Sequence, residues 1–187
     1  ERSWLDLVDV IDELTPQQLK LAVTEYRPGV DLLACPEEIN WNNPLNLKGL
    51  GSLLDVCRDQ YDLIVLDVPA GSSGYPRMAL ELVDLRLIVL TPDAPTLRAT
   101  LRYLNNLPSA KTPLGLVINQ LAQGAAVTPA EIKDHLGQPL FGVLPIDSRG
   151  VWTNISYGEP CVLRKSSKLG RAIRQLSGRL LKIVNSG

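Results

Sequence analysis

The residues best placed to do chemistry follow an apolar run near the middle of the chain. Residues 63–66 (LIVL) predict a buried strand that runs directly into Asp67, and Pro69, Ala70 and Gly71 come soon after. A carboxylate at the C-terminal end of a buried parallel strand lies where open α/β sheets bind ligands. The Pro-Ala-Gly turn can also bring backbone N–H groups close to a phosphate. Two interpretations remain: Asp67 belongs to a ligand site, or it only caps the turn that follows.

Other residues that commonly bind metals or act in catalysis are sparse. Cys35, Cys57 and Cys161 are odd in number, far apart and outside any CxxC spacing. This pattern argues against a disulfide framework or a zinc site and favours a reducing cytoplasm. His135, the single histidine, falls in a predicted surface helix with no cluster of cysteines or carboxylates around it. We therefore expect no metal or catalytic role for it.

The elements that must position Asp67 alternate between short apolar runs and longer amphipathic ones. Apolar runs predict strands buried on both faces at residues 30–34, 63–66, 87–91, 114–119 and 140–144. Helical spacing or capping signals predict helices at 4–14, after Thr15, and at 45–58, 96–107, 128–136 and 166–184. This alternation predicts an α/β fold with a mostly parallel sheet flanked by helices. With 187 residues, 45% of them hydrophobic, and no long linker, we expect one domain.

Five segments in order carry a resemblance to a known family. They are DLIVLDVPAG at 62–71, VDLRLIVLTPDAPTLRATLRYLNNL at 83–107, LVINQ at 116–120, FGVLPID at 141–147 and GEPCV at 158–162. Together they resemble the MinD/ParA superfamily of P-loop ATPases. The first looks like the Walker B and switch II region, and the others look like the strands, base-side elements and C-terminal segment that follow it. Each motif is weak alone, but their collinear order is fairly specific.

The resemblance implies roles for particular residues. Asp67 would be the catalytic carboxylate that helps hold Mg²⁺, through water, beside the phosphates of ATP. Gly71 would lie at the phosphates, Asn119 would contact adenine, and Pro145 and Asp147 would lie beside the base. We expect the residues other than Gly71 to converge at the C-terminal ends of their strands. Gln120 stands where the family commonly has arginine, so that arginine's role has no counterpart here.

The glycine-rich phosphate loop of the family is missing. No Gly-Lys dipeptide occurs in the sequence, and residues 48–52 (KGLGS) lie inside a predicted helix rather than after a strand. The chain also begins at Glu1, and we expect residues 1–187 to be the C-terminal part of a longer ATPase domain. In the family, the phosphate-loop strand lies between the strands that end here at Asp67 and Thr91. Residues 1–187 alone are not expected to hydrolyse ATP, bind it tightly or carry a cofactor.

The N-terminal third suggests one branch of the family. RPGVDLLACPEEI at 27–39 and LLDVCRDQYDLIVLDVPAG at 53–71 look like CpaE/TadZ proteins. That resemblance implies a role in pilus assembly or polar localisation, a homodimer that binds ATP and Mg²⁺ when intact, and pilus or secretion-system partners. It also implies a receiver-like domain upstream and a cytoplasmic, membrane-associated or polar location. The alternatives are a non-catalytic scaffold that docks partners, and a biotin- or cobalamin-synthesis enzyme, for which no substrate-binding insertion is present.

The C-terminal segment is strongly basic. No acidic residue follows Glu159, whereas seven basic ones do: Arg164, Lys165, Lys168, Arg171, Arg174, Arg179 and Lys182. An apolar stripe at 169, 173, 176 and 180 predicts a helix packed on the sheet. The favoured interpretation is a solvated basic face on a structural helix. The functional alternative is weak, salt-sensitive contact with DNA or an anionic membrane.

Overall fold

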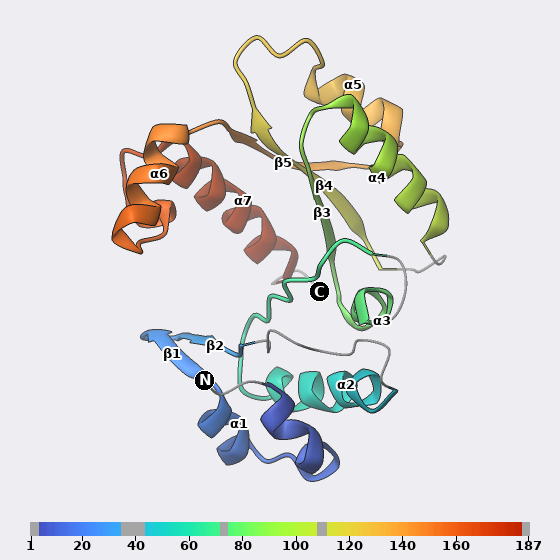
Figure 1. Cartoon of the computed structure of the whole chain (residues 1–187), viewed down its shortest axis with the longest axis vertical. Coiled ribbons are helices and arrows are strands. Elements are labelled where there is room, and N and C mark those ends of the chain that lie inside the picture. The colour runs from blue at the N-terminus through green and yellow to red at the C-terminus, as the bar shows by residue number, and fades with distance from the viewer. Residues whose placement is uncertain (1–3, 35–43, 72–74, 108–111, 185–187) are drawn as a thin grey trace. The chain divides into compact units, whose positions relative to one another are not determined.

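The computed structural model describes residues 4–34, 44–71, 75–107 and 112–184 (Figure 1). The chain divides into two compact units, an N-terminal unit of residues 1–83 and a C-terminal unit of residues 84–187. Helices and strands alternate along the C-terminal unit, as the sequence predicted. The assignment of the whole chain to one domain stays a prediction.

The N-terminal unit is mainly helical. A 3-10 helix η1 (Trp4–Glu13) precedes α1 (Pro16–Ala22), and α2 (Pro44–Arg58) and α3 (Tyr75–Leu82) follow later in the chain. Thr15 and Gln18 form a capping box at the start of α1, with proline in its first turn, so the predicted cap is confirmed. The KGLGS segment lies inside α2, which confirms its predicted position within a helix.

A small hairpin replaces the first predicted buried strand. β1 (Thr24–Arg27) pairs antiparallel with β2 (Val30–Leu32), and every residue of both strands is exposed. The prediction of a parallel, buried strand at 30–34 is wrong. The cause is local, because Pro28 and Gly29 occupy the central positions of a tight turn and Gly29 has φ +80°. Proline followed by a glycine at positive φ favours a turn that reverses the chain.

Two hydrophobic clusters hold the helices of the N-terminal unit together. One contains Trp4, Leu19 and Cys57, and the second contains Leu54 and Ala79. Burial raises the pKa of the Cys57 thiol, as expected for a cysteine that acts as a small apolar side chain.

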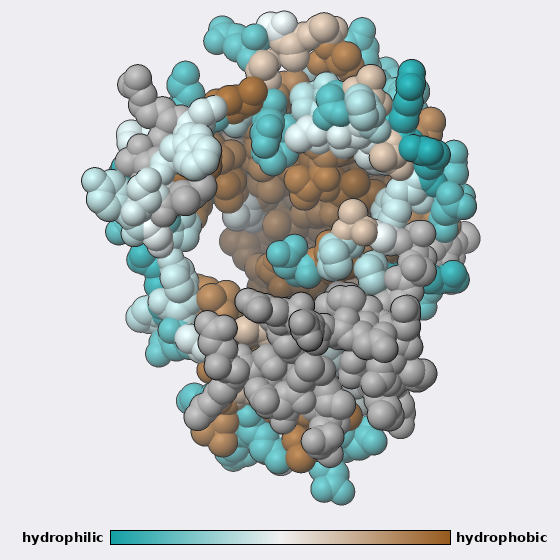
Figure 2. All heavy atoms as spheres, viewed as in Figure 1, coloured by the Kyte–Doolittle hydropathy of each residue, from teal (hydrophilic) through white to brown (hydrophobic). Residues whose placement is uncertain are grey.

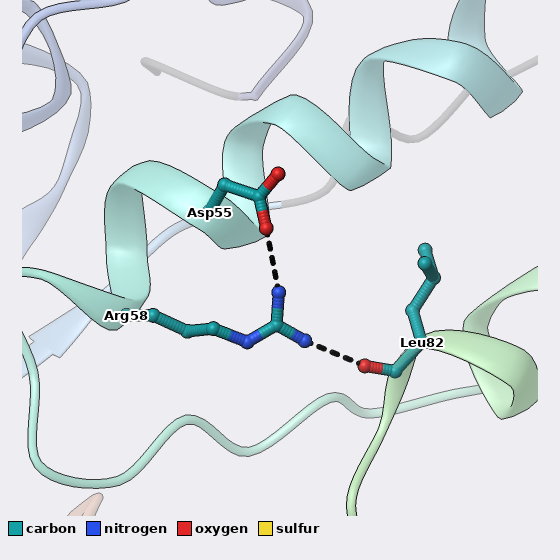
Figure 3. Close-up of polar contacts among 3 residues, drawn as sticks. All are labelled: Asp55, Arg58 and Leu82. Atoms are coloured by element: carbon teal, nitrogen blue, oxygen red, sulfur yellow. Dashed lines mark hydrogen bonds and ion pairs between the residues drawn. The ribbon is translucent and has the colours of Figure 1, made fainter.

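Polar contacts at the end of α2 join it to α3 (Figure 3). One guanidinium nitrogen of Arg58 lies 2.7 Å from a carboxylate oxygen of Asp55, one turn earlier on the same helix. Another nitrogen of Arg58 donates to the carbonyl oxygen of Leu82 at 2.8 Å, at the last residue of α3. The arginine thereby satisfies a carbonyl that the helix end leaves unpaired.

The strand predicted at residues 63–66 has no partner strand. Among the described residues, no strand pairs with this segment. Its exposure still alternates as in a half-buried strand, since Leu63 and Val65 are 45% and 79% exposed while Ile64 and Leu66 pack against the hydrophobic clusters. The prediction of a paired strand buried on both faces is therefore wrong for the described chain. A β ladder needs a neighbour, and the described residues supply none at this position.

Tyr61, just before this segment, is joined to the hairpin. Its hydroxyl donates to a carboxylate oxygen of Asp31 at 2.7 Å. Burial, with the hydrogen bond to Asp31 as the next cause, raises the pKa of Tyr61 to about 12. The contact links β2 to the start of the run that ends at Asp67.

Tyr61 gives the N-terminal unit a predicted alkaline titration. Because its folded pKa lies above the ordinary value of 10, this interaction stabilises the folded state fully below pH 10 and is lost as the pH rises toward about 12. In Tyr61→Phe, the most alkaline component of the tyrosinate absorbance titration should disappear. Tyr26→Phe, at an exposed position of β1, is the control and should keep that component. An unchanged curve for Tyr61→Phe would contradict the assignment.

The C-terminal unit contains a three-stranded parallel sheet. Its strands are β3 (Arg86–Leu90), β4 (Leu114–Leu121) and β5 (Leu140–Pro145), in the order β3-β4-β5. Helices follow each strand: α4 (Ala94–Asn106), α5 (Pro129–Leu136) and α6 (Ser148–Tyr157), then a short η2 (Cys161–Leu163) and the long α7 (Lys168–Val184). This is the predicted α/β fold, a parallel sheet flanked by helices, and the prediction is confirmed.

Both faces of the sheet contact helices. α4 and α5 lie on one side of the sheet and α7 lies on the other (Figure 1). The core between the sheet and α4 and α5 is formed by Leu90, Leu116, Ile118, Ile132 and Leu136. Coverage is incomplete over β3, where Val89 is 62% exposed, and hydrophobic atoms are visible over the sheet of this unit (Figure 2).

Helix α7 presents its apolar stripe inward. Residues 169, 173, 176 and 180 are all partly buried, and the side chain of Leu176 lies so close to Gly142 of β5 that an added Cβ would meet it at 2.7 Å. Two of the basic side chains bind the chain itself, since Arg179 donates to the carbonyl oxygen of Phe141 at 2.6 Å and Arg174 donates to that of Val162. Across the described residues, no helix is long and apolar enough to cross a membrane.

Candidate functional site

The C-terminal ends of β4 and β5 bring three of the predicted site residues together. Leu121 of β4 is paired with Pro145 of β5, and the N–H of Ile146 donates to the carbonyl oxygen of Leu121 at 3.3 Å. Asn119 and Pro145 therefore lie at the same edge of the sheet, and Asp147 comes two residues later. Asp67 belongs to the N-terminal unit. Its position at this edge stays a prediction.

Asn119 sits at an irregularity at the end of β4. The register between β4 and β5 shifts between Ile118 and Leu121, and Gln120 within this shift has φ +57°. The backbone N–H of Gln120 donates to Oδ1 of Asn119 at 2.9 Å. Asn119 is partly buried and Gln120 is exposed. The strand thus ends in a bulge, a feature common beside functional sites.

The carboxylate of Asp147 holds the start of two helices. Its Oδ1 accepts a hydrogen bond from the N–H of Gly150 in α6 at 3.1 Å. Its Oδ2 accepts from the hydroxyl of Ser167 at 2.9 Å and from the N–H of Leu169 in α7 at 3.3 Å. The hydrogen bond from Ser167, followed by that from Leu169, lowers the pKa of Asp147. Both oxygens are thus engaged within the chain, and a role for Asp147 at a nucleotide base stays a prediction.

Replacing Asp147 with asparagine is predicted to destabilise the C-terminal unit by about 1–2 kcal/mol, the usual cost of losing a helix cap or a charge-assisted hydrogen bond. Because the folded pKa is lowered, the carboxylate's contribution is present above the ordinary aspartate pKa and is lost as the pH falls through the folded value. Urea unfolding near neutral pH and below about pH 4 measures the difference. Asp134→Asn, at an exposed site in α5, is the control. Equal stabilities for Asp147→Asn and the unmodified chain at neutral pH would contradict the assigned caps.

A polar turn follows β3 at the same edge of the sheet. Asp93 caps α4 by accepting a hydrogen bond from the N–H of Thr96 at 2.9 Å, and it also accepts one from the hydroxyl of Thr91. These hydrogen bonds, that from Thr91 first, lower the pKa of Asp93. The sequence predicted the strand at 87–91 and the helix at 96–107, but not Asp93 as the cap of that helix. Ser167, which caps α7 through the N–H of Gly170, was not predicted either. In both cases the signal was an Asp or Ser just before a helical pattern.

Asp67 and Gly71 have open surroundings. Asp67 is exposed, and among the described residues no side chain or backbone group is hydrogen bonded to its carboxylate. A Cβ added to Gly71 would lie 3.4 Å from the ring of Pro76, which is an ordinary van der Waals distance. A free carboxylate is suited to hold a cation through water. The part of the chain that the structure describes contains no group of three or more metal-binding side chains.

The sheet edge offers an amide at Asn119 and the backbone beside Pro145, which can contact a base. It offers no lysine from a glycine-rich loop, since the sequence has no Gly-Lys dipeptide. Triphosphate binding normally depends on such a loop and on the helix N-terminus that follows it.

Comparisons with known proteins found relatives of this chain but no matching family. No protein-family model matches the chain. A putative septum site-determining protein MinD from Emiliania huxleyi is 31% identical over 126 residues, which make up 64% of this chain and 46% of that protein. The septum site-determining protein MinD of Synechocystis is 26% identical over 187 residues, which make up 96% of this chain and 70% of that protein. The chain thus spans about half of the first relative's length and more of the second's.

Solved structures give the class of fold. A ParA family ATPase from Chlorobium tepidum has a TM-score of 0.82 at 21% identity and covers 96% of this chain and 76% of its own. The MinC:MinD cell division protein complex of Aquifex aeolicus has a TM-score of 0.79 at 22% identity. The match covers 97% of this chain and 73% of that one. MinD of Pyrococcus horikoshii complexed with Mg-ADP has a TM-score of 0.70 at 22% identity. The match covers 97% of this chain and 80% of that one.

These likenesses define the class as an α/β fold whose parallel sheet and flanking helices match those of MinD and ParA structures. The two sequence relatives, at 31% and 26% identity, are likewise MinD proteins.

Proposed function

We propose that residues 1–187 are the C-terminal part of the nucleotide-binding domain of a CpaE/TadZ-type ATPase. In this proposal the chain supplies the Mg²⁺ side and the base side of an ATP site. The phosphate-binding loop comes from a segment outside residues 1–187, so the chain alone neither hydrolyses ATP nor binds it tightly.

The observation that carries this proposal is a pair of unpaired strand edges. β3 is at one edge of its sheet, and its outer backbone groups have no strand partner among the described residues. Residues 63–66 have the alternating burial of a strand and likewise pair with no described strand. In the family, the phosphate-loop strand lies between the counterparts of these two segments. A strand inserted there would supply hydrogen-bond partners for backbone N–H and C=O groups that otherwise pair with no strand.

Residue roles follow from the family resemblance and the local geometry. The exposed carboxylate of Asp67, which has no hydrogen-bond partner among the described residues, would hold Mg²⁺ through water, and Gly71 would lie beside the phosphates. Asn119, Pro145 and Asp147 would line the base side, with Asp147 contributing through the backbone turn that its side chain fixes. The solved P. horikoshii MinD complex with Mg-ADP is a precedent for nucleotide and metal together in this fold.

The biological setting is proposed from the branch resemblance. A CpaE/TadZ-type protein would act in pilus assembly or polar localisation as an ATP-bound homodimer with secretion-system partners, in the cytoplasm, at a pole or at the membrane. The MinC:MinD complex of A. aeolicus is a precedent for partner binding in this fold. Contact of α7 with DNA or anionic lipid would be weak, because Arg174 and Arg179 are already hydrogen bonded to backbone carbonyl oxygens.

The second candidate function is a non-catalytic scaffold of the same fold. It is favoured by the absence of a Gly-Lys dipeptide from these residues. Measuring ATP hydrolysis by the longer protein that contains this chain separates the two candidates. The proposal expects a GK[ST] loop after an apolar strand upstream of Glu1, and Mg²⁺-dependent turnover. An upstream region without such a loop, or a longer protein without turnover, would favour the scaffold.

A further inference from the structure

The last residues of β4 adopt an unusual backbone conformation. Gln120 has φ +57° and is the single non-glycine residue with positive φ in the part of the chain described. An L-residue in the left-handed region is unfavourable unless its surroundings require it, whereas glycine adopts this region freely. Such residues are concentrated at functional sites.

The bulge that contains Gln120 removes two residues from the β ladder. Ile118 is paired with Val143 of β5, and Leu121 is the next β4 residue in register, opposite Pro145. Asn119 and Gln120 lie between these pairs. Their backbone is therefore free to turn away from β5 while both flanking pairs stay fixed.

The turn at Gln120 determines which atom of Asn119 faces outward. The N–H of Gln120 donates to the side chain of Asn119 at 2.9 Å, and a donor must face the amide oxygen rather than the amide nitrogen. This hydrogen bond fixes the orientation of the amide. The Nδ2 group, with two donor hydrogens, then points away from the backbone, and no described residue accepts from it.

We infer that Gln120 is a positioning residue whose left-handed backbone holds Asn119 as a hydrogen-bond donor toward an acceptor nitrogen of a purine base. The inference rests on the proposed function, because it concerns the base side of the same nucleotide site. Gln120 acts through its backbone, so its own side chain is dispensable. A glycine at this position should serve equally well, and a β-branched residue should not.

The test uses the 187-residue chain, labelled with ¹⁵N and titrated with adenosine, which has a base and no phosphate. The unmodified chain and Gln120→Gly should both show shifts of the Asn119 side-chain NH₂ signals at millimolar adenosine, with similar affinities. Gln120→Val, which disfavours positive φ, should weaken binding by about five- to tenfold, the contribution of one hydrogen bond. Equal binding and equal Asn119 shifts for Gln120→Val would overturn the inference.

Hydrogen exchange provides a readout that does not depend on ligand. The Gln120 amide should exchange slowly in the unmodified chain and faster in Asn119→Ala, which lacks the acceptor oxygen. Unchanged exchange in Asn119→Ala would overturn the inference even if Gln120→Val failed to fold. If exchange behaves as expected but the unmodified chain does not respond to adenosine, the proposed base site fails, and the inferred role of Gln120 at a ligand fails with it.

Discussion

Replacing Asp67 with asparagine is expected to slow ATP hydrolysis about 100-fold in the longer protein that combines this chain with a phosphate loop. Asparagine preserves the shape of the side chain but removes the negative charge that would hold Mg²⁺ through water. Because Asp67 is exposed and makes no hydrogen bond with described residues, the substitution should leave stability nearly unchanged. The measurement is kcat under saturating Mg-ATP, together with the unfolding midpoint.

Asp62→Asn is the matched control for this experiment. Asp62 is also exposed and begins the same apolar segment, but it lies at the end opposite Asp67. It should retain kcat within about twofold, because a change far from the ligand edge removes no transition-state contact. Equal losses in both variants, or full activity in Asp67→Asn, would contradict the Mg²⁺ role.

Replacing Gly170 with alanine is expected to destabilise the C-terminal unit by about 1–3 kcal/mol. In an open helix the same change normally stabilises by up to about 1 kcal/mol. Gly170 is buried in α7, and a Cβ there would meet the carbonyl oxygen of Cys161 at 2.4 Å. That atom belongs to the backbone of η2, so the clash requires α7 and η2 to separate. Chemical denaturation of both proteins gives the difference.

Gly178→Ala provides the control on the same helix. A Cβ at Gly178 would meet nothing within 4 Å. This variant should be more stable than the unmodified chain, which separates helix propensity from close packing. If Gly170→Ala were as stable as Gly178→Ala, the close approach of α7 to η2 would be wrong.

The sequence predicted best where local signals and burial agree. The capping boxes at Thr15 and Thr128 begin helices as expected, because their hydrogen bonds involve residues three positions apart. The strands at β3, β4 and β5 were recognised because both faces of these runs are largely apolar. The helices α3 and α6 were missed. In α6, the first residues are Ser-Arg-Gly, which resemble a turn rather than the start of a helix.

The failures concern interactions with distant residues. An apolar run such as residues 63–66 predicts a strand, but its pairing depends on a neighbour that the run does not contain. The run at 30–34 was assigned to the sheet although the adjacent Pro28 and Gly29 favour a hairpin. At the candidate site, the family resemblance predicted roles for Asn119 and Asp147, and these roles stay predictions. It did not predict the bulge at Gln120 or the hydrogen bond from Ser167 to Asp147, because both depend on the tertiary structure.

In the proposed function, these residues supply the Mg²⁺ and base sides of a nucleotide site whose phosphate loop lies outside residues 1–187. Tight binding of ATP depends mainly on backbone N–H groups and a lysine around the phosphates. Without them, the triphosphate near Asp67 would meet a carboxylate, which is repulsive unless Mg²⁺ intervenes.

Calorimetric titration of the 187-residue chain with Mg-ATP measures whether these residues bind the nucleotide without that loop. We expect no binding in the micromolar range, because contacts to the base alone do not compensate for missing phosphate contacts. Micromolar affinity for the chain by itself would refute the proposed division of the site and would show that these residues contain a phosphate site of their own.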